Sequence, residues 1–201
     1  MRSNLRVVLP GLILLCLWVP RAQATYVINV YQSGPNVVAS GSGSINTAGL
    51  TNFGNGSGQP GVYPTNGNLG VGLAAADTGF STVSGPSFGS GPFVAANSAS
   101  GTYVQLGLFA SGIYLIQGYV SGTIMSGTAT WNSTTIAALG MNLGTYTYTW
   151  GSGANADSLV LIIGSAPAPT GTPAPSSIYL IVAGLAVSAA WGAIRMRKSV
   201  A

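Results

Sequence analysis

The charged residues of this chain lie almost entirely at its two ends, which limits what its long middle can fold into. The 201 residues hold six basic side chains, and all six flank one of two apolar runs. Between Arg21 and Arg195 the only charged residues are Asp77 and Asp157. Positive charge resists crossing a bilayer and apolar runs enter it, so this pattern is typical of a protein that is exported and anchored.

The first apolar run, residues 7–19, is too short to span a bilayer comfortably. It is soon followed by Ala22-Gln23-Ala24, the small-x-small pattern that signal peptidase accepts. We therefore predict a signal peptide over residues 1–24, with cleavage between Ala24 and Thr25. Cys16 lies within this run and is predicted to leave with it, so no disulfide forms within the mature chain.

The second apolar run, residues 178–194, reaches with the two preceding serines about the length that spans a ~30 Å hydrocarbon core. Arg195, Arg197 and Lys198 follow it and predict a stop-transfer signal with a cytoplasmic tail over residues 195–201. A buried core helix is the alternative. Such a helix rarely follows a proline-rich linker and precedes a basic cluster, so we predict a transmembrane helix.

Residues 25–164 are predicted to form one exported domain, because short β-rich runs alternate there with clusters of Gly, Ser and Asn. The expected fold is all-β, a single Gly/Ser-rich β-sandwich or jelly-roll-like domain. Residues 165–177 alternate proline with small residues, which predicts an extended linker.

Individual strands are expected from period-2 patterns and turn residues. The first two are expected to form a hairpin, residues 46–70 are expected to be mainly loop with a weak strand at 50–53, and 136–139 are expected to form a short helical turn capped from 132–135. The predicted strands are 26–31, 36–45, 93–95, 103–109, 118–123, 123–131, 145–150 and 158–163.

The two ends together resemble a known sorting signal. A signal peptide, the sequence Pro173-Ala174-Pro175-Ser176-Ser177, an apolar helix and a terminal Arg-Met-Arg-Lys are similar to the tripartite PEP-CTERM signal of exopolysaccharide-producing bacteria. Residues 126–164 also resemble glycine-rich PEP-CTERM proteins of unknown function. Ala174 stands where that family has Glu.

The resemblance implies two processing partners, signal peptidase and an exosortase, which is a membrane-embedded cysteine transpeptidase that reads and cleaves the tail. It also implies a location: the chain is exported, anchored in the inner membrane during sorting, and then placed at the cell surface or in the extracellular matrix. The residues that it assigns to recognition are Pro173 and Pro175 with the neighbouring Ser176 and Ser177.

Catalytic chemistry is scarce in the predicted mature chain. It has no His, Cys or Glu and, before the anchor, no Lys or Arg. We therefore predict no enzyme activity, no cofactor, no metal site and no nucleic-acid binding. Asp77 and Asp157 could form a glycosidase pair. Structural roles are favoured instead, with Asp77 in a turn with Thr78-Gly79 and Asp157 capping or preceding a strand.

The aromatic residues of the last strands suggest a ligand. Tyr146, Tyr148 and Trp150 alternate and so share one face of a strand, and Trp131 is a fourth ring nearby. Exposed rings stack on sugars, which makes these four the candidate contacts for exopolysaccharide. A stripe of this kind is more often hydrophobic core, and the core interpretation is favoured.

These observations predict a non-enzymatic surface or extracellular-matrix protein with a structural or adhesive role. The alternative is a carbohydrate-binding module for exopolysaccharide. Asn55 and Asn132 match the N-glycosylation sequon, a pattern that is frequent by chance. A strand-rich and nearly uncharged surface also favours self-association through sheet edges.

Overall fold

The structure, a computed structural model, describes residues 25–107 and 112–167. The predicted cleavage residues Ala22 and Ala24, the sorting motif 173–177, the transmembrane segment 178–194 and the basic tail 195–201 lie outside the described residues. Within the two described ranges, no helix combines the length and the apolar character needed to cross a membrane.

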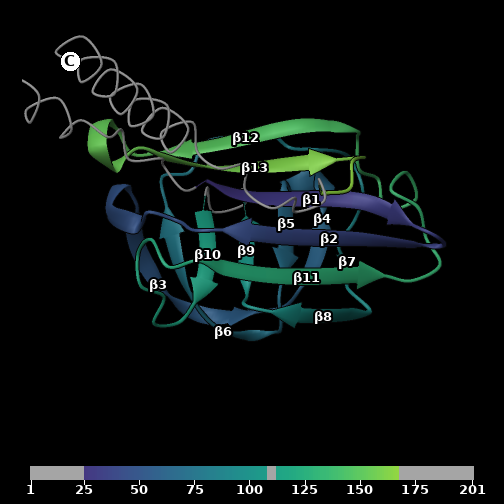
Figure 1. The fold of residues 1–201 in the computed structure, drawn as a ribbon, viewed down its shortest axis with the longest axis horizontal. Helices are drawn as coiled ribbons and strands as arrows, with labels where there is room; N and C mark the ends of the chain where they lie inside the picture. The colour runs from purple at the N-terminus through teal and green to yellow at the C-terminus, as the bar shows by residue number, and fades with distance from the viewer. Residues whose placement is uncertain (1–24, 108–111, 168–201) are drawn as a thin grey trace, which may run out of the picture. The chain divides into compact units, whose positions relative to one another are not determined.

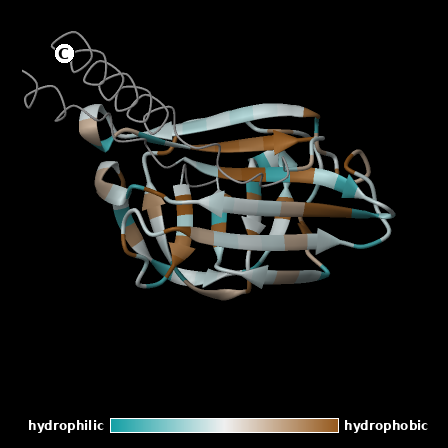
Figure 2. Cartoon of the chain, viewed as in Figure 1, coloured by the Kyte–Doolittle hydropathy of each residue, from teal (hydrophilic) through white to brown (hydrophobic). Residues whose placement is uncertain are grey.

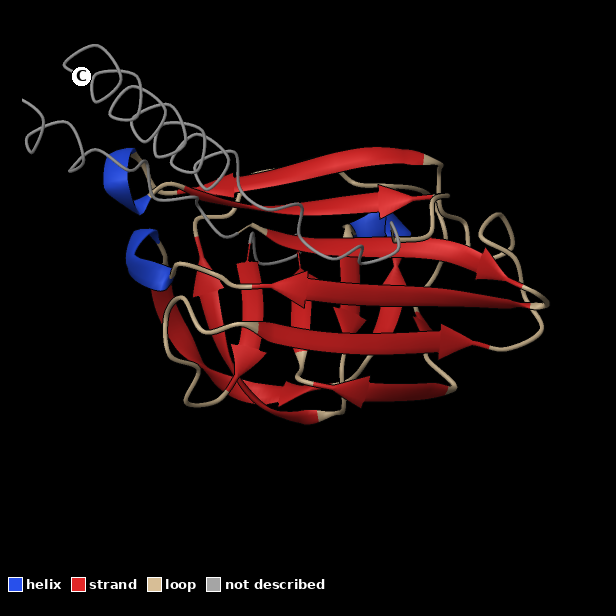
Figure 3. Ribbon diagram, viewed as in Figure 1, coloured by secondary structure: helices blue, strands red, loops and turns tan. Residues whose placement is uncertain are grey.

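The described residues form an all-β domain built from two sheets, as the sequence predicted (Figures 1 and 3). The six-stranded sheet is called sheet A, and the seven-stranded sheet is called sheet B. The strands of sheet A are, in spatial order, β12 (Gly144–Trp150), β13 (Asp157–Ile163), β1 (Tyr26–Ser33), β2 (Asn36–Gly43), β11 (Met125–Trp131) and β8 (Ser98–Gly101).

Sheet B contains the shorter and more irregular strands. In spatial order these are β3 (Thr51–Gly58), β6 (Ala75–Ser81), β10 (Gly112–Ile116), β9 (Val104–Gly107), β5 (Asn68–Val71), β4 (Gly61–Tyr63) and β7 (Val94–Ala95). Single turns of 3-10 helix lie in the connections at Thr47–Gly49, Pro64–Asn66 and Gly153–Asn155.

The first and last strands lie side by side in the middle of sheet A. Strand β1 pairs in parallel with β13, Tyr26 opposite Leu159 and Val30 opposite Ile163. Its other edge pairs antiparallel with β2 across the turn at Gly34, where the positive φ of 57° suits glycine. Both edges of β1 are therefore hydrogen-bonded, and the two ends of the domain are joined through one sheet.

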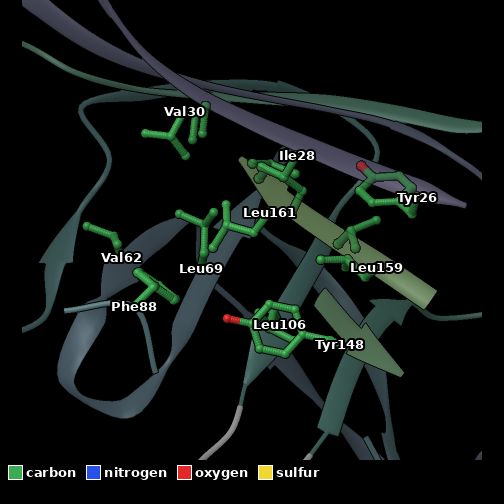
Figure 4. Close-up of a cluster of buried hydrophobic side chains, with 14 of the residues drawn as sticks. Tyr26, Ile28, Val30, Val62, Leu69, Phe88, Leu106, Tyr148, Leu159 and Leu161 are labelled. Carbon is green, nitrogen blue, oxygen red and sulfur yellow. The ribbon is translucent and has the colours of Figure 1, made fainter. Parts of the chain in front are cut away.

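The core lies between the two sheets. Side chains alternate between buried and half-buried along β1 and β13, as a sheet with one covered face requires. Buried residues of both sheets belong to one cluster, and Figure 4 shows its members meeting across the gap. Figure 2 shows apolar colours along β13, on part of β1 and on strands of sheet B. The labelled members include Ile28, Val30, Leu159 and Leu161 from sheet A and Val62, Leu69 and Leu106 from sheet B.

The sequence predicted sheet A well. The strands expected at 26–31, 36–45, 123–131, 145–150 and 158–163 are confirmed as β1, β2, β11, β12 and β13, and the first hairpin is confirmed. The expected turn near 136–139 is also present. The Leu139 N–H donates to the Thr135 carbonyl at 3.0 Å, and the Ala138 N–H donates to Thr135 Oγ1 at 3.1 Å.

Sheet B was predicted less well. Strands expected at 93–95 and 103–109 correspond to β7 and β9. The weak strand expected at 50–53 corresponds to the start of β3. The loop expected over the rest of residues 46–70 is wrong, because the remainder of β3, β4 and most of β5 lie there. The strand expected at 118–123 is wrong as well, because these residues form turns. The Tyr119 hydroxyl stabilises them: it accepts a hydrogen bond from the Ile45 N–H at 3.0 Å, and its single proton lies between the Thr123 and Ile45 carbonyls, 2.8 and 3.1 Å away.

Aromatic rings pack on glycines throughout the domain. A Cβ added to Gly41 would lie 2.5 Å from the Tyr26 hydroxyl, and one added to Gly107 would lie 2.7 Å from Cε2 of Tyr114. A Cβ on Gly58 would overlap the ring of Tyr103, which is completely buried. Each ring occupies the space that a side chain would fill at the glycine, so these glycines are needed for ring packing as well as for backbone flexibility.

We expect Gly58→Ala to lower the free energy of unfolding by about 1–3 kcal/mol, because the Tyr103 ring must move to admit the methyl group. In a Tyr103→Ala background the same change is expected to cost much less. Denaturant unfolding of the two single variants and the double variant gives this coupling energy. If Gly58→Ala lowers the free energy of unfolding equally in both backgrounds, the Tyr103 ring does not require glycine at position 58.

Candidate functional site

Three of the four rings predicted to contact sugar lie in the core. Trp131, Tyr148 and Trp150 are at most 4% exposed. Each polar group donates to a backbone carbonyl: Trp131 Nε1 to Val94 at 3.1 Å, Tyr148 Oη to Pro86 at 2.9 Å and Trp150 Nε1 to Asn46 at 2.9 Å. A buried ring has no face free for a sugar, so the structure supports the core interpretation for these three.

Tyr146 is half-buried and differs from the other rings. Its ring packs edge-on against Phe88, with centroids 6.1 Å apart, and its hydroxyl donates to the Asn142 carbonyl at 3.1 Å. It shares a strand face with Tyr148, as the alternation predicted. Tyr146 thus closes the border of the core, and the four rings do not form an exposed platform.

Asp157 holds a neighbouring loop in place. It is 7% exposed and is the first residue of β13. Its Oδ2 accepts a hydrogen bond from the Asn46 N–H at 2.6 Å, and its Oδ1 accepts one from the Ser158 N–H at 2.7 Å. The same Asn46 accepts the Trp150 hydrogen bond, so the carboxylate anchors the chain after β2 to the strands at the other end of the sequence. This matches the structural role predicted for Asp157 at a strand start.

Asp77 is not in a turn, and that prediction is wrong. It lies inside β6, paired with Gly56 of β3 on one side and Ile116 of β10 on the other, and it is 3% exposed. The Asp-Thr-Gly sequence suggested a turn because these residue types occur often in turns. Pairing with β3 on one side and β10 on the other holds the segment in an extended conformation instead.

The surroundings of Asp77 form a small polar cluster that the sequence did not reveal. Paired residues project to the same face of a sheet, so Asp77 shares the face of Ile116 and Tyr114, opposite to the core residues Ile113 and Leu115. The buried Tyr103 also lies outside the hydrophobic core, and its hydroxyl donates to Gln105 Oε1.

Burial raises the pKa of the Asp77 carboxyl above its usual value of 3.8, and a hydrogen bond from the Gly56 N–H offsets part of that increase. Burial also raises the pKa of the Tyr103 and Tyr114 hydroxyls, and the nearby charge of Asp77 adds to both shifts. The cluster therefore holds a carboxyl group that favours its neutral form more than an exposed aspartate does.

The two carboxylates do not form a catalytic pair. Asp157 shares its strand face with Leu159 and Leu161 and so points toward the core side of sheet A. Asp77 lies on the face of sheet B that points away from the core. The body of sheet B separates them, so a glycosidase arrangement is wrong for these residues. Within residues 25–107 and 112–167, no three His, Cys, Asp or Glu side chains lie close enough to hold a metal ion.

The outer face of sheet A carries a regular set of hydroxyl groups at its β8 edge. The register places Ser42 opposite Ser126 and Ser40 opposite Thr128, and Thr128 lies opposite Ser100 on its other side. The Ser100 and Thr128 hydroxyls are hydrogen-bonded at 2.8 Å. We call this set the hydroxyl array; its members are Ser40, Ser42, Ser98, Ser100, Ser126, Thr128 and Thr130.

Sequence reasoning missed the hydroxyl array, although a signal for it was present. Ser and Thr alternate with Gly and Ala in both β2 and β11, which places every hydroxyl of these segments on one face. What the sequence could not supply is that β2, β11 and β8 are neighbours. Neighbouring strands lie about 4.8 Å apart, so the array is a neutral surface of closely spaced donors and acceptors.

No protein-family model, curated protein or solved structure that was compared with this chain matches it. The candidate sites therefore rest on their own geometry.

We expect stability to depend on Asp77 in an acid range. Because the folded pKa is raised, the folded state binds the proton more tightly than the unfolded chain does. The resulting stabilisation is fully present below pH about 3.8 and is lost as the pH rises through the raised pKa. Asp77→Asn cannot titrate, so its melting temperature relative to the wild type should rise between pH about 4 and about 7. A difference that stays constant over this range would contradict the assignment.

Proposed function

We propose that this chain is a non-enzymatic exported protein with a structural or adhesive role at the cell surface or in the extracellular matrix. One observation carries the proposal: both carboxylates of residues 25–167 are buried, so the domain surface consists of neutral groups. A surface of hydroxyls, amides and glycines suits many weak contacts with a neutral hydrated polymer.

The sorting part of the proposal rests on the ends of the sequence. The PEP-CTERM-like tail, residues 173–201, would carry the chain to an exosortase-type transpeptidase, after signal peptidase has cut between Ala24 and Thr25. The membrane would hold the chain between these two steps. The domain would then be released or attached outside the inner membrane, where a neutral surface is suited to contact with exopolysaccharide.

We propose a β-sandwich as the finer description of the domain. The support is that buried residues of sheets A and B belong to one cluster while each sheet keeps a second, outward face. In this arrangement the hydroxyl array and the Asp77 cluster lie on opposite outer faces. The array is then free for a ligand, and the cluster serves the stability of sheet B.

A carbohydrate-binding module is the second candidate, and the hydroxyl array favours it. Sugar hydroxyls are donors and acceptors at once, and the Ser and Thr side chains of the array are the same. The candidate ligand is exopolysaccharide, held by β2, β11 and β8 and not by the buried rings of the C-terminal strands.

The sorting proposal is tested by the intact mass and the terminal peptides of the protein from its native cells, measured separately for membrane and extracellular fractions. We expect a chain that starts at Thr25 and ends within residues 173–177 in the extracellular fraction. Recovery only of chains that retain residues 178–201 would contradict processing by a transpeptidase, and the protein would then be permanently anchored.

The carbohydrate proposal predicts that the double variant Thr128→Val and Thr130→Val binds purified exopolysaccharide more weakly than the wild type. Valine keeps the shape of threonine and removes the hydroxyl, so each lost hydrogen bond should cost about 0.5–1.5 kcal/mol. The matched control is Thr145→Val with Thr147→Val on β12, which makes the same change outside the array. Isothermal titration gives the affinities, and equal binding by the two double variants would contradict a role for the array.

A further inference from the structure

Each sheet has two edges, and the four edge strands differ in how well they are covered. Strand β7 has two residues, and β8 has four, of which Gly101 accepts a hydrogen bond from the Leu73 N–H. Strand β12 is longer, but Ser84 and Thr149 exchange two backbone hydrogen bonds of 3.0 and 3.1 Å along its outer side. The remaining edge strand, β3, has eight residues, and Figure 1 shows it at the border of sheet B.

The outer side of β3 has free hydrogen-bonding capacity. Its partner on the inner side is β6, and seven of its eight residues are exposed. In the part of the chain that the structure describes, the backbone bonds of β3 go to β6, apart from a local bond from the Gly54 N–H to Asn52 Oδ1. An edge of this length presents a row of unpaired N–H and C=O groups.

The usual protections of a sheet edge are largely missing from β3. It contains no charged residue and no proline, and both of these are common means of blocking a further strand. One protection is present, a bulge between Asn52 and Gly54 that shifts the register. Beyond the bulge the pairing with β6 keeps one register from Gly54 to Gly58, and the glycines of this segment allow another backbone to approach closely.

We propose that β3 pairs antiparallel with β3 of a second copy of this chain, joining the two B sheets into one continuous sheet. An antiparallel strand pair is self-complementary under a two-fold axis, so the same edge serves both copies. The charges favour a copy as the occupant, because the two carboxylates of residues 25–167 are buried and two such surfaces meet without repulsion.

The proline-rich segment after the domain is a poor occupant of this edge. Residues 165–177 hold four prolines in alternation with small residues, and a proline has no N–H to donate to a ladder. Pairing between copies therefore remains the better match. The proposal goes beyond the proposed function, because it concerns association of the purified chain and does not require sorting or sugar binding.

The test is sedimentation of the full chain in detergent micelles over a range of concentrations, for the wild type and Ser57→Lys. Ser57 is exposed on β3, so a lysine there brings two like charges to the shared edge. We expect the dissociation constant to rise by about tenfold or more. The matched controls are Ser87→Lys in an exposed loop and Thr147→Lys on edge β12, which add the same charge elsewhere. Both should stay within about twofold of the wild type.

Amide hydrogen exchange locates the contact independently. The β3 amides should become protected as the concentration rises, while those of β8 and β12 should not. If Ser57→Lys does not fold, Thr51→Lys at the other end of the same strand takes its place. A monomer at all concentrations, equal weakening by the controls, or β3 protection that is independent of concentration would each overturn the proposal, the last by showing that another part of the same chain covers the edge.

Discussion

The parallel contact between β1 and β13 joins the two ends of the domain in the middle of sheet A. Strand β13 brings three buried apolar side chains to the core and carries β12 on its far side. Its Asp157 also fixes the chain after β2 through Asn46. Forming this pair closes a loop that contains nearly the whole domain, which costs conformational entropy before the core compensates for it. Sheet B therefore lacks the complete inner face of sheet A until β13 has paired with β1. Folding of the domain depends on residues from both of its ends.

The sequence predicted sheet A and missed much of sheet B for one physical reason. In β1 and β13 the apolar residues alternate strictly, because one face is buried against a core. Strand β3 reads TNFGNGSG and buries no side chain in that core, so its composition is that of a loop. Pairing with β6 makes it a strand, and single-sequence patterns contain no information on pairing partners. Residues 118–123 show the opposite error: a β-like composition there is overruled by the hydrogen bonds of Tyr119.

The candidate sites were predictable only where a local pattern decides the role. The position of Asp157 before an apolar run correctly indicated a strand start. The alternation of Tyr146, Tyr148 and Trp150 correctly indicated a shared face, yet whether that face is covered depends on the other sheet. Asp77 was misassigned because Asp-Thr-Gly has turn composition, and its raised pKa arises from strands distant in sequence. The hydroxyl array likewise exists only because β8 lies beside β11.

Glycine and tyrosine act as a pair in this domain, which explains how a glycine-rich chain can have an ordered interior. A glycine in a strand normally weakens it, because it loses more backbone freedom on folding and has no side chain to pack. Here rings occupy the vacant positions, Tyr103 over Gly58 and Tyr26 over Gly41. Each ring buries a large apolar area, and a buried tyrosine hydroxyl can still bond to the backbone, as Tyr148 does with Pro86. A few buried rings thus supply much of the packing. The glycines of β3 have no side chains that would keep another strand away from its edge. The Gly- and Asn-rich composition of β3 therefore has two effects: it gives no strand pattern in the sequence, and it leaves the strand's outer edge without blocking side chains.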